Sequence, residues 1–256
     1  MLLAIDIGNT NIVLGCIRDD DILFRERIST NHTATDLEYA AHLRTALEIH
    51  GVDIKDIDGA IISSVVPDLT NTVKTAVNKY IGSEVMTVGP GIKTGLSILI
   101  DNPAQLGSDL VVDAVAGINE YKAPMIIIDM GTATTLSLID EQKRHLGCTI
   151  MTGLKTSAEA LVSRAAQLQN VSFDKPKKII GTNTVDSVRN GLLYSNACAI
   201  DGMVERIEEE LGQKCTVIAT GGLASTVLPL CKRQDIILDD DLLLKGLKII
   251  YKKNRK

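Results

Sequence analysis

A pattern that occurs twice, 123 residues apart, constrains the fold of this chain more than any other feature of its sequence. The first copy, LLAIDIGNTNIVLG, begins at position 2 and has Asp6-x-Gly8 between two apolar stretches. The second copy, MIIIDMGTATTLSLID, begins at position 125 and has Asp129-x-Gly131 at the same place. Short apolar stretches separated by turn residues are typical of β-strands. The sequence therefore predicts two similar halves, each with a carboxylate at the first turn.

The elements that follow the two copies are also similar, with three strands in a meander and then helix, strand and helix. In the first half we expect the meander to consist of strands at 2–7, 11–17 and 22–29, followed by a helix over about 35–50. After this helix we expect the strand GAIISSVVP, a helix from 67 to about 80, the strand EVMTV and a helix in QLGSDLVVDAVAGINEY. In the second half we expect, after the repeated motif, the strand HLGCTIM, helices over about 156–168 and 185–210, the strand CTVIATGGLA and a final helix over 241–252. Thr35 with Glu38 predicts a capping box, and Pro67 a helix start.

The division between the halves is expected near residues 118–124. We therefore predict an N-terminal half, 1–118, and a C-terminal half, 119–256. No low-complexity linker separates them, which favours a tight interface with a cleft over two swinging domains.

Composition narrows the classes of partner. A net charge of −5, 3% aromatic residues and no Trp argue against nucleic acid. No apolar run reaches the roughly 20 residues of a membrane helix. The 5 cysteines form no CxxC pair and the 4 histidines show no ligand spacing, which indicates free thiols and no zinc site. No signal peptide is visible, so we expect a cytoplasmic protein.

The two Asp-x-Gly turns have the residue types of a phosphate-binding site. Glycine lets backbone amides approach phosphate oxygens, and Thr and Asn side chains add hydrogen bonds. A carboxylate at the end of a strand can hold a metal ion or its water shell. One such copy could be an ordinary turn with an Asx cap, but two equivalent copies favour phosphate binding. Gly221-Gly222, after the strand VIAT, would let the backbone lie against a flat ring.

This organisation resembles the superfamily of acetate kinase, the sugar kinases and actin. Within it, DIGNTNIVLG, NPAQLGSDLVVDAVA, IIDMGTATTLSLID, GLKTSAEALVSRAAQL and ATGGLA resemble the type III pantothenate kinases in order and spacing, over nearly the whole chain. The resemblance implies an α/β fold of two ribonuclease H-like halves facing an ATP cleft, the actin-like kinase fold. It also implies ATP-dependent phosphorylation of pantothenate to 4'-phosphopantothenate, the first step of coenzyme A synthesis.

The resemblance further implies the site residues. Asp109 corresponds to the catalytic base, and Asp129 to the residue that binds a monovalent cation, K⁺ or NH₄⁺; Mg²⁺ would accompany ATP near Asp6. The residues implied to bind ATP are Asp6, Gly8, Asn9, Thr10, Asn11, Thr132, Gly221 and Gly222. Those implied to contact pantothenate are Ile100, Gly107, Ser108, Leu110 and Thr184, the last from near a subunit interface.

Asp109 and Asp129 each have a catalytic and a structural interpretation. In the catalytic one, phosphoryl transfer depends mainly on positioning and charge neutralisation, and Asp109 would accept the proton of the acceptor hydroxyl. Asp109 could instead be a first-turn Asp that only favours the helix dipole. Asp129 could be a structural turn residue.

The acceptor side departs from the family pattern at two positions. Leu110 and Ile100 stand where the family has Arg and Tyr. A missing Arg removes a charge-assisted partner of the pantothenate carboxylate, worth ~1.5–3 kcal/mol. Lys155, Arg164 or the partner subunit could supply that charge. The sequence therefore also allows a kinase for a different hydroxyl acceptor, or a non-catalytic regulatory relative.

The predicted long helix over about 185–210 has more apolar surface than one small half needs. Its apolar residues include Val188, Leu192, Ala199, Met203 and Ile207, and its small residues include Ser195, Ala197 and Cys198. Small residues allow close approach of helices, so we expect a two-fold homodimer through this helix, as the resemblance also implies.

Overall fold

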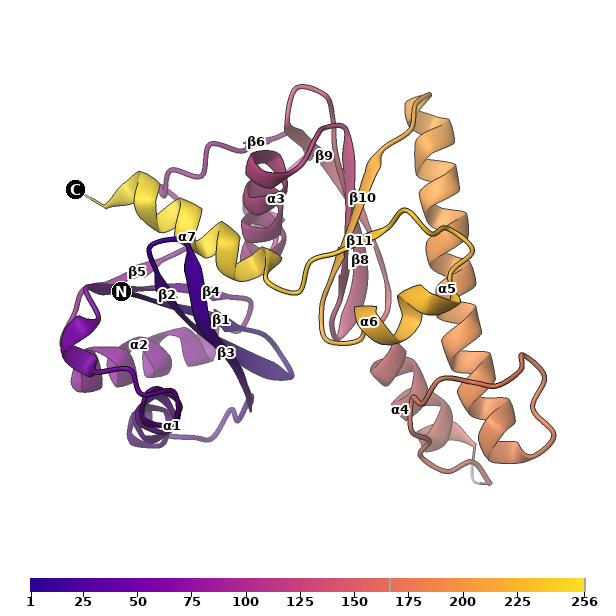
Figure 1. Cartoon of the computed structure of the whole chain (residues 1–256), viewed down its shortest axis with the longest axis horizontal. Helices are drawn as coiled ribbons and strands as arrows, with labels where there is room; N and C mark the ends of the chain where they lie inside the picture. Colours follow the sequence, from indigo (N-terminus) through magenta and orange to yellow (C-terminus); the bar gives the residue numbers. More distant parts are fainter. Residues whose placement is uncertain (166, 256) are drawn as a thin grey trace. The chain divides into compact units, whose positions relative to one another are not determined.

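The computed structural model describes residues 1–165 and 167–255, which form two compact units. The first unit consists of Met1–Leu96, Asp101–Asn119 and the chain from Asp241 onward. The second consists of Ser97–Ile100 and Glu120–Asp240. Each unit has its own sheet and its own apolar core (Figure 1).

The first unit is built on a five-stranded sheet with the order β3-β2-β1-β4-β5. Its strands are β1 (Leu2–Ile7), β2 (Asn11–Arg18), β3 (Asp21–Ser29), β4 (Gly59–Ser64) and β5 (Val85–Thr87). β1 pairs antiparallel with β2 and parallel with β4. Every residue of β1 is buried, because helices cover both faces of the sheet.

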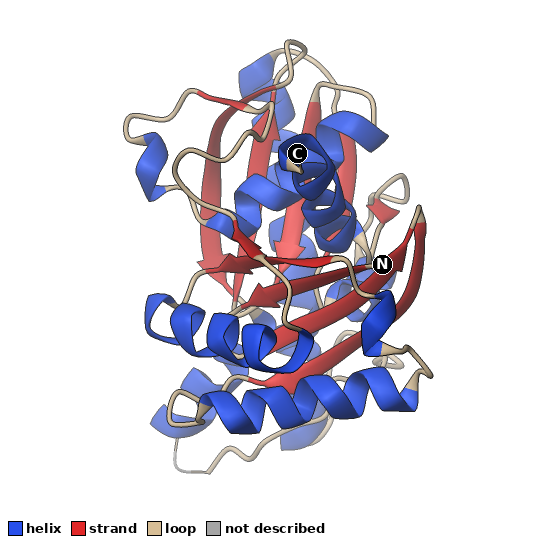
Figure 2. Ribbon diagram, turned by 90° about the vertical axis from the view of Figure 1, so that its left-hand side faces the viewer, coloured by secondary structure: helices blue, strands red, loops and turns tan. Residues whose placement is uncertain are grey.

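Two pairs of helices cover these faces. α1 (Asp36–Ile49) and α2 (Pro67–Ile81) pack side by side on one face, against Leu3, Ile5 and Ile7 (Figures 1 and 2). α3 (Ser108–Glu120) and α7 (Leu242–Asn254) form a core with Leu2 and Ala4 on the other face. Two short 3-10 turns, Ile54–Asp56 and Pro103–Gln105, lie in the connections.

The second unit repeats the strand arrangement of the first within a six-stranded sheet, β11-β10-β7-β8-β9-β6. Its strands are β6 (Ser97–Ile98), β7 (Met125–Met130), β8 (Ala133–Ile139), β9 (Arg144–Thr152), β10 (Thr216–Thr220) and β11 (Ile237–Leu238). β7, β8 and β9 form an antiparallel meander, and β10 pairs parallel with β7 as β4 does with β1. The prediction of two similar α/β halves is therefore confirmed.

Helices of the second unit pack on one face of its sheet. They are α4 (Leu154–Arg164), the long α5 (Thr184–Leu211), the short α6 (Ala224–Val227) and a 3-10 turn, Leu228–Leu230. Leu193, Ile200 and Val204 of α5 pack with Ile126 and Ile128 of β7.

The local signals for helix ends are confirmed. The backbone N–H of Glu38 donates to Thr35 Oγ1, and the Glu38 carboxylate accepts from the Thr35 N–H, which together form the expected capping box. Pro67 is the first residue of α2. The helix expected over about 156–168 begins earlier and ends earlier, since α4 spans Leu154–Arg164; residue 166 of the expected range lies outside the described residues.

The units differ from the expected halves in two segments. α7 belongs to the first unit, because its Leu244, Leu247 and Ile250 lie in that unit's core. Tyr251 of α7 also fills the space beside Gly59, where a Cβ would lie 2.1 Å from the tyrosine oxygen. Residues 97–100 belong to the second unit because β6 pairs with β9.

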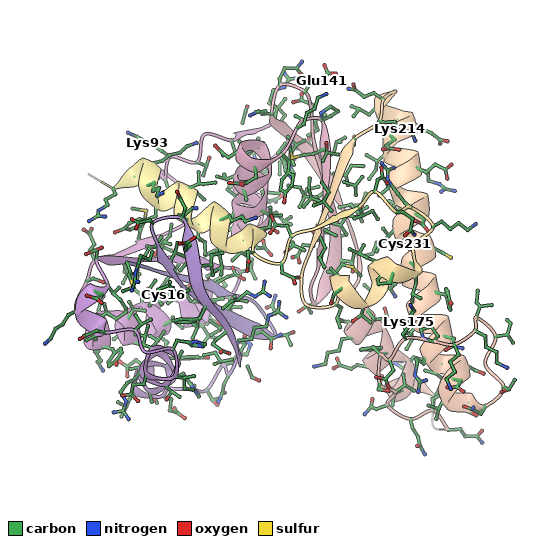
Figure 3. The ribbon with its side chains drawn as sticks, in the orientation of Figure 1. Cys16, Lys93, Glu141, Lys175, Lys214 and Cys231 are labelled. Atoms are coloured by element: carbon green, nitrogen blue, oxygen red, sulfur yellow. The ribbon has the colours of Figure 1, made fainter. Side chains whose placement is uncertain are left out.

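All five cysteines are free thiols, as expected. Cys16 lies in the first sheet, and Cys231 lies against α5, with its Sγ 3.9 Å from the carbonyl oxygen of Ala197 (Figure 3). Among the residues described, no helix has the length and apolar character needed to cross a membrane.

Candidate active site

The two Asp-x-Gly turns connect the first and second strands of each meander. In the first unit the Gly8 N–H donates to the Asn11 carbonyl at 3.0 Å. In the second, the Gly131 N–H donates to the Ala133 carbonyl at 3.0 Å. The remaining predicted loop residues, Asn9, Thr10, Asn11 and Thr132, are exposed. Each turn therefore presents polar groups at the end of a buried strand, as a phosphate-binding loop requires.

Asp6 and Asp109 are brought to one edge of the first sheet. Asp6 pairs in register with Ser63, near the ends of the parallel strands β1 and β4. Ser63 Oγ in turn donates to Ser108 Oγ at 3.0 Å, and Asp109 is the next residue. In open α/β sheets, ligands bind at this carboxyl-terminal edge. The first Asp-x-Gly turn and the candidate base Asp109 thus share the edge where a ligand is expected.

Asp109 lies in the first turn of α3, and its Oδ1 accepts from the Leu110 N–H at 2.8 Å. Burial raises the pKa of its carboxyl above 3.8, against the lowering effect of its backbone hydrogen bonds. A Cβ at Gly107 would lie 2.4 Å from Asp109 Oδ1. Gly107 therefore leaves the space that this carboxylate occupies.

Ser108 has a role that the sequence did not predict. Its hydroxyl donates to the Ser64 carbonyl at 2.8 Å and accepts from the Ser64 N–H at 3.0 Å. These bonds fix the start of α3 to the end of β4. The position of Asp109, the next residue, is set by this attachment.

In the second unit, Asp129 and Gly221 are in direct contact. Asp129 is half-buried and pairs in register with Thr220, so Gly221 follows β10 directly beside it. Gly221 has φ +96°, and a Cβ there would lie 2.6 Å from the Met130 nitrogen and 2.7 Å from Asp129 Oδ1. Gly222, the next residue, is exposed. The sequence identified Asp129 and Gly221 separately but did not predict their contact.

Carboxylate oxygens suit both Mg²⁺ and K⁺ as ligands. The space that a Cβ at Gly221 would fill lies against one such oxygen, Asp129 Oδ1. Asp6 and Asp129 therefore fit a role in holding cations. Across residues 1–165 and 167–255 there is no cluster of three or more His, Cys, Asp or Glu side chains suited to a metal.

The residues expected to contact pantothenate are divided between the two units. Leu110 is buried in α3 of the first unit, whereas Ile100 is half-buried just after β6 of the second. Thr184 is exposed at the start of α5 and lines an open cavity of about 680 Å³ with Leu161 and Val188. Lys155 and Arg164 of α4, which could supply a positive charge, are both exposed.

Two similar units of this kind, each with a polar loop after the first strand of its sheet, define the actin-like kinase fold. The fold is similar to component A of (R)-2-hydroxyglutaryl-CoA dehydratase from Acidaminococcus fermentans, with a TM-score of 0.57 at 16% identity over 100% of this chain and 99% of that one.

The sequence comparison is more specific. The family model of the type III pantothenate kinases matches residues 2–206. A type III pantothenate kinase of Halalkalibacterium halodurans is 44% identical over 99% of this chain and 100% of its own length. One from Bacillus cytotoxicus is 43% identical over 99% of this chain and 97% of its own. The chain belongs to the type III pantothenate kinase family and is a kinase of coenzyme A synthesis.

Proposed function

We propose that the protein transfers the terminal phosphoryl group of ATP to the hydroxyl group of pantothenate, with Asp109 as the general base. The observation that carries this proposal is the hydrogen bond from Ser63, in register with Asp6, to Ser108, the residue before Asp109. It supports a common site for a phosphate loop and a base. The family membership supports pantothenate as the acceptor.

The proposed roles of the loops follow from their exposed polar groups. Residues 8–11 and Thr132 would bind phosphate oxygens through backbone amides and side-chain hydroxyl or amide groups. Gly221 and Gly222 would accept the nucleotide base, since they offer backbone without side chains. Asp6 would hold Mg²⁺ through its water shell, and Asp129 would hold K⁺ or NH₄⁺. A bound divalent cation neutralises charge on the phosphates during transfer.

Asp109 would take the proton of the acceptor hydroxyl. Desolvation of this half-buried carboxyl raises its pKa, which makes the carboxylate a better proton acceptor than an exposed Asp. The test of the proposed function is ATP consumption with and without pantothenate. Turnover that requires pantothenate supports it. ATP binding without turnover on any hydroxyl acceptor would instead indicate the non-catalytic relative.

The role of Asp129 predicts a dependence on monovalent cations. At equal ionic strength, the rate should be higher in potassium or ammonium chloride than in sodium chloride. The reason is that K⁺ and NH₄⁺ are larger than Na⁺ and would fit the potassium site proposed at Asp129. Asp129→Asn should remove most of this difference. Steady-state rates in the three salts provide the measurement, and equal rates for the wild type would contradict the cation role.

The aliphatic pair Leu110 and Ile100 predicts weak binding of the pantothenate carboxylate, since neither side chain can neutralise its charge. The double variant Leu110→Arg with Ile100→Tyr should lower the KM for pantothenate about tenfold, the effect of one charge-assisted hydrogen bond. The KM for ATP should stay unchanged.

Leu110→Met, which keeps an uncharged side chain of similar size, is the matched control and should leave both constants unchanged. If the wild type already has a low KM for pantothenate and the double variant is no better, another group, such as Lys155 or Arg164, supplies the charge.

The exposed surface of α5 supports the proposed homodimer, but through other residues than those that the sequence indicated. Met203 and Ile207, expected at the interface, pack partly against the core of their own unit. The exposed side of α5 carries the small residues Gly191, Ser195 and Cys198. We expect a two-fold dimer through this side, and Ser195→Arg should weaken it. Analytical ultracentrifugation at micromolar protein measures the mass, and a concentration-independent wild-type monomer would contradict the proposal.

A further inference from the structure

Both proposed phosphate loops are tied to the end of the third strand of their own meander by equivalent backbone hydrogen bonds. In the first unit the residue after β3, Thr30, donates its N–H to the Thr10 carbonyl at 3.0 Å. In the second unit the residue after β9, Gly153, donates its N–H to the Thr132 carbonyl at 3.2 Å. Sequence repetition alone does not reveal this equivalence, because the bonded residues lie far apart in each half.

A threonine hydroxyl adds a second bond to each loop. Thr30 Oγ1 donates to the Gly8 carbonyl at 2.6 Å, across 22 residues of sequence. Thr156 Oγ1, in the first turn of α4, donates to the Thr132 carbonyl at 2.7 Å, across 24 residues. Both distances are those of good O–H···O hydrogen bonds.

These bonds fix the orientation of peptide groups within the loops. A peptide group is planar, so holding its carbonyl also sets the direction of its N–H. The Thr30 hydroxyl thereby orients the peptide between Gly8 and Asn9, and the Thr156 hydroxyl that between Thr132 and Ala133. Phosphate binding by backbone amides depends on such preorganised directions.

The second loop is also held by close packing. A Cβ at Gly153 would lie 2.4 Å from the carbonyl oxygens of both Gly131 and Thr132. The backbone at the start of α4 therefore lies directly on the loop, and the Thr156 hydroxyl completes this contact.

We propose that Thr30 and Thr156 are positioning residues for ATP binding, one for each phosphate loop. The inference rests on the proposed function of the two loops. Neither threonine needs to touch the nucleotide, since each acts through a loop carbonyl.

The experiment compares Thr30→Val and Thr156→Val with Thr30→Ser and Thr156→Ser. Valine keeps the shape of the side chain and removes the donor, whereas serine keeps the hydroxyl. Each valine variant should raise the KM for ATP about three- to tenfold, the effect of one hydrogen bond, with little change in the KM for pantothenate. Each serine variant should restore the wild-type KM for ATP.

Thr45→Val is the matched control. Thr45 Oγ1 also donates to a backbone carbonyl, that of Ala41 at 2.8 Å, but both residues belong to α1 and neither belongs to a loop. This variant should leave both KM values unchanged. A lower Tm in the Thr30 and Thr156 valine variants with an unchanged KM for ATP would overturn the inference, as would an equal rise in both KM values.

Calorimetric binding of a non-hydrolysable ATP analogue separates this inference from the proposed function. Absence of binding to the wild type would refute the ATP site itself. Wild-type binding that the valine variants retain in full would refute only the positioning role.

Discussion

Asp109→Asn is expected to reduce kcat by about two to four orders of magnitude, the usual contribution of a general base. Asparagine has the same shape, so it fits beside Gly107, but it cannot accept the hydroxyl proton. Since the variant leaves the proposed phosphate loops unchanged, ATP affinity should stay within a few-fold of the wild type. Turnover assays and calorimetric ATP binding measure the two effects separately.

The dependence of kcat on pH, on the acid side, is a second test of Asp109 as the general base. Burial raises the pKa of its carboxyl, and only the deprotonated form can accept a proton. The wild-type kcat should therefore fall as the pH drops through this raised pKa, at a higher pH than for an exposed Asp.

Asp68→Asn is the matched control, because Asp68 lies in the first turn of α2 as Asp109 lies in the first turn of α3. It removes the same helix-dipole interaction and should leave turnover unchanged. If Asp109→Asn keeps most of the wild-type rate, Asp109 only stabilises its helix and the base assignment is wrong.

Gly221→Ala should reduce kcat/KM for ATP by about a hundredfold, the effect of moving a site residue by roughly 1 Å. The added Cβ would lie 2.6 Å from the Met130 nitrogen and 2.7 Å from Asp129 Oδ1, so backbone or carboxylate must shift. Its φ of +96° adds strain for any residue with a Cβ. Steady-state kinetics with varied ATP measure the loss.

Gly82→Ala is the control that introduces backbone strain without displacing a neighbouring atom. Gly82 also has a positive φ, +71°, but a Cβ there meets no atom within 4 Å. It should lower the free energy of unfolding by about 1 kcal/mol and leave kcat/KM for ATP unchanged. Comparable kinetic losses in both variants would mean that general destabilisation, rather than displacement of Asp129, accounts for the effect.

The sequence by itself determined the features that arise from nearby residues. The strands flanking Asp6 and Asp129, the capping box of Thr35 and the start of α2 at Pro67 follow from periodicity, turn residues and caps, which act over a few positions. The repeated motif predicted the two similar units, because the same local pattern forms the same meander. The motifs together also indicated the family that the comparisons show.

Only the tertiary structure decided which residues from distant parts of the chain meet. The amphipathic pattern of α7 predicts a helix, but not that Leu244 and Leu247 would join the core of the first unit. Ser108 bonded to Ser64, and Gly221 packed on Asp129, are likewise contacts between separate elements. Such contacts depend on how sheets and helices pack, and this packing leaves no periodic signal in the local sequence. The physical support of the candidate site therefore became visible only in the folded chain.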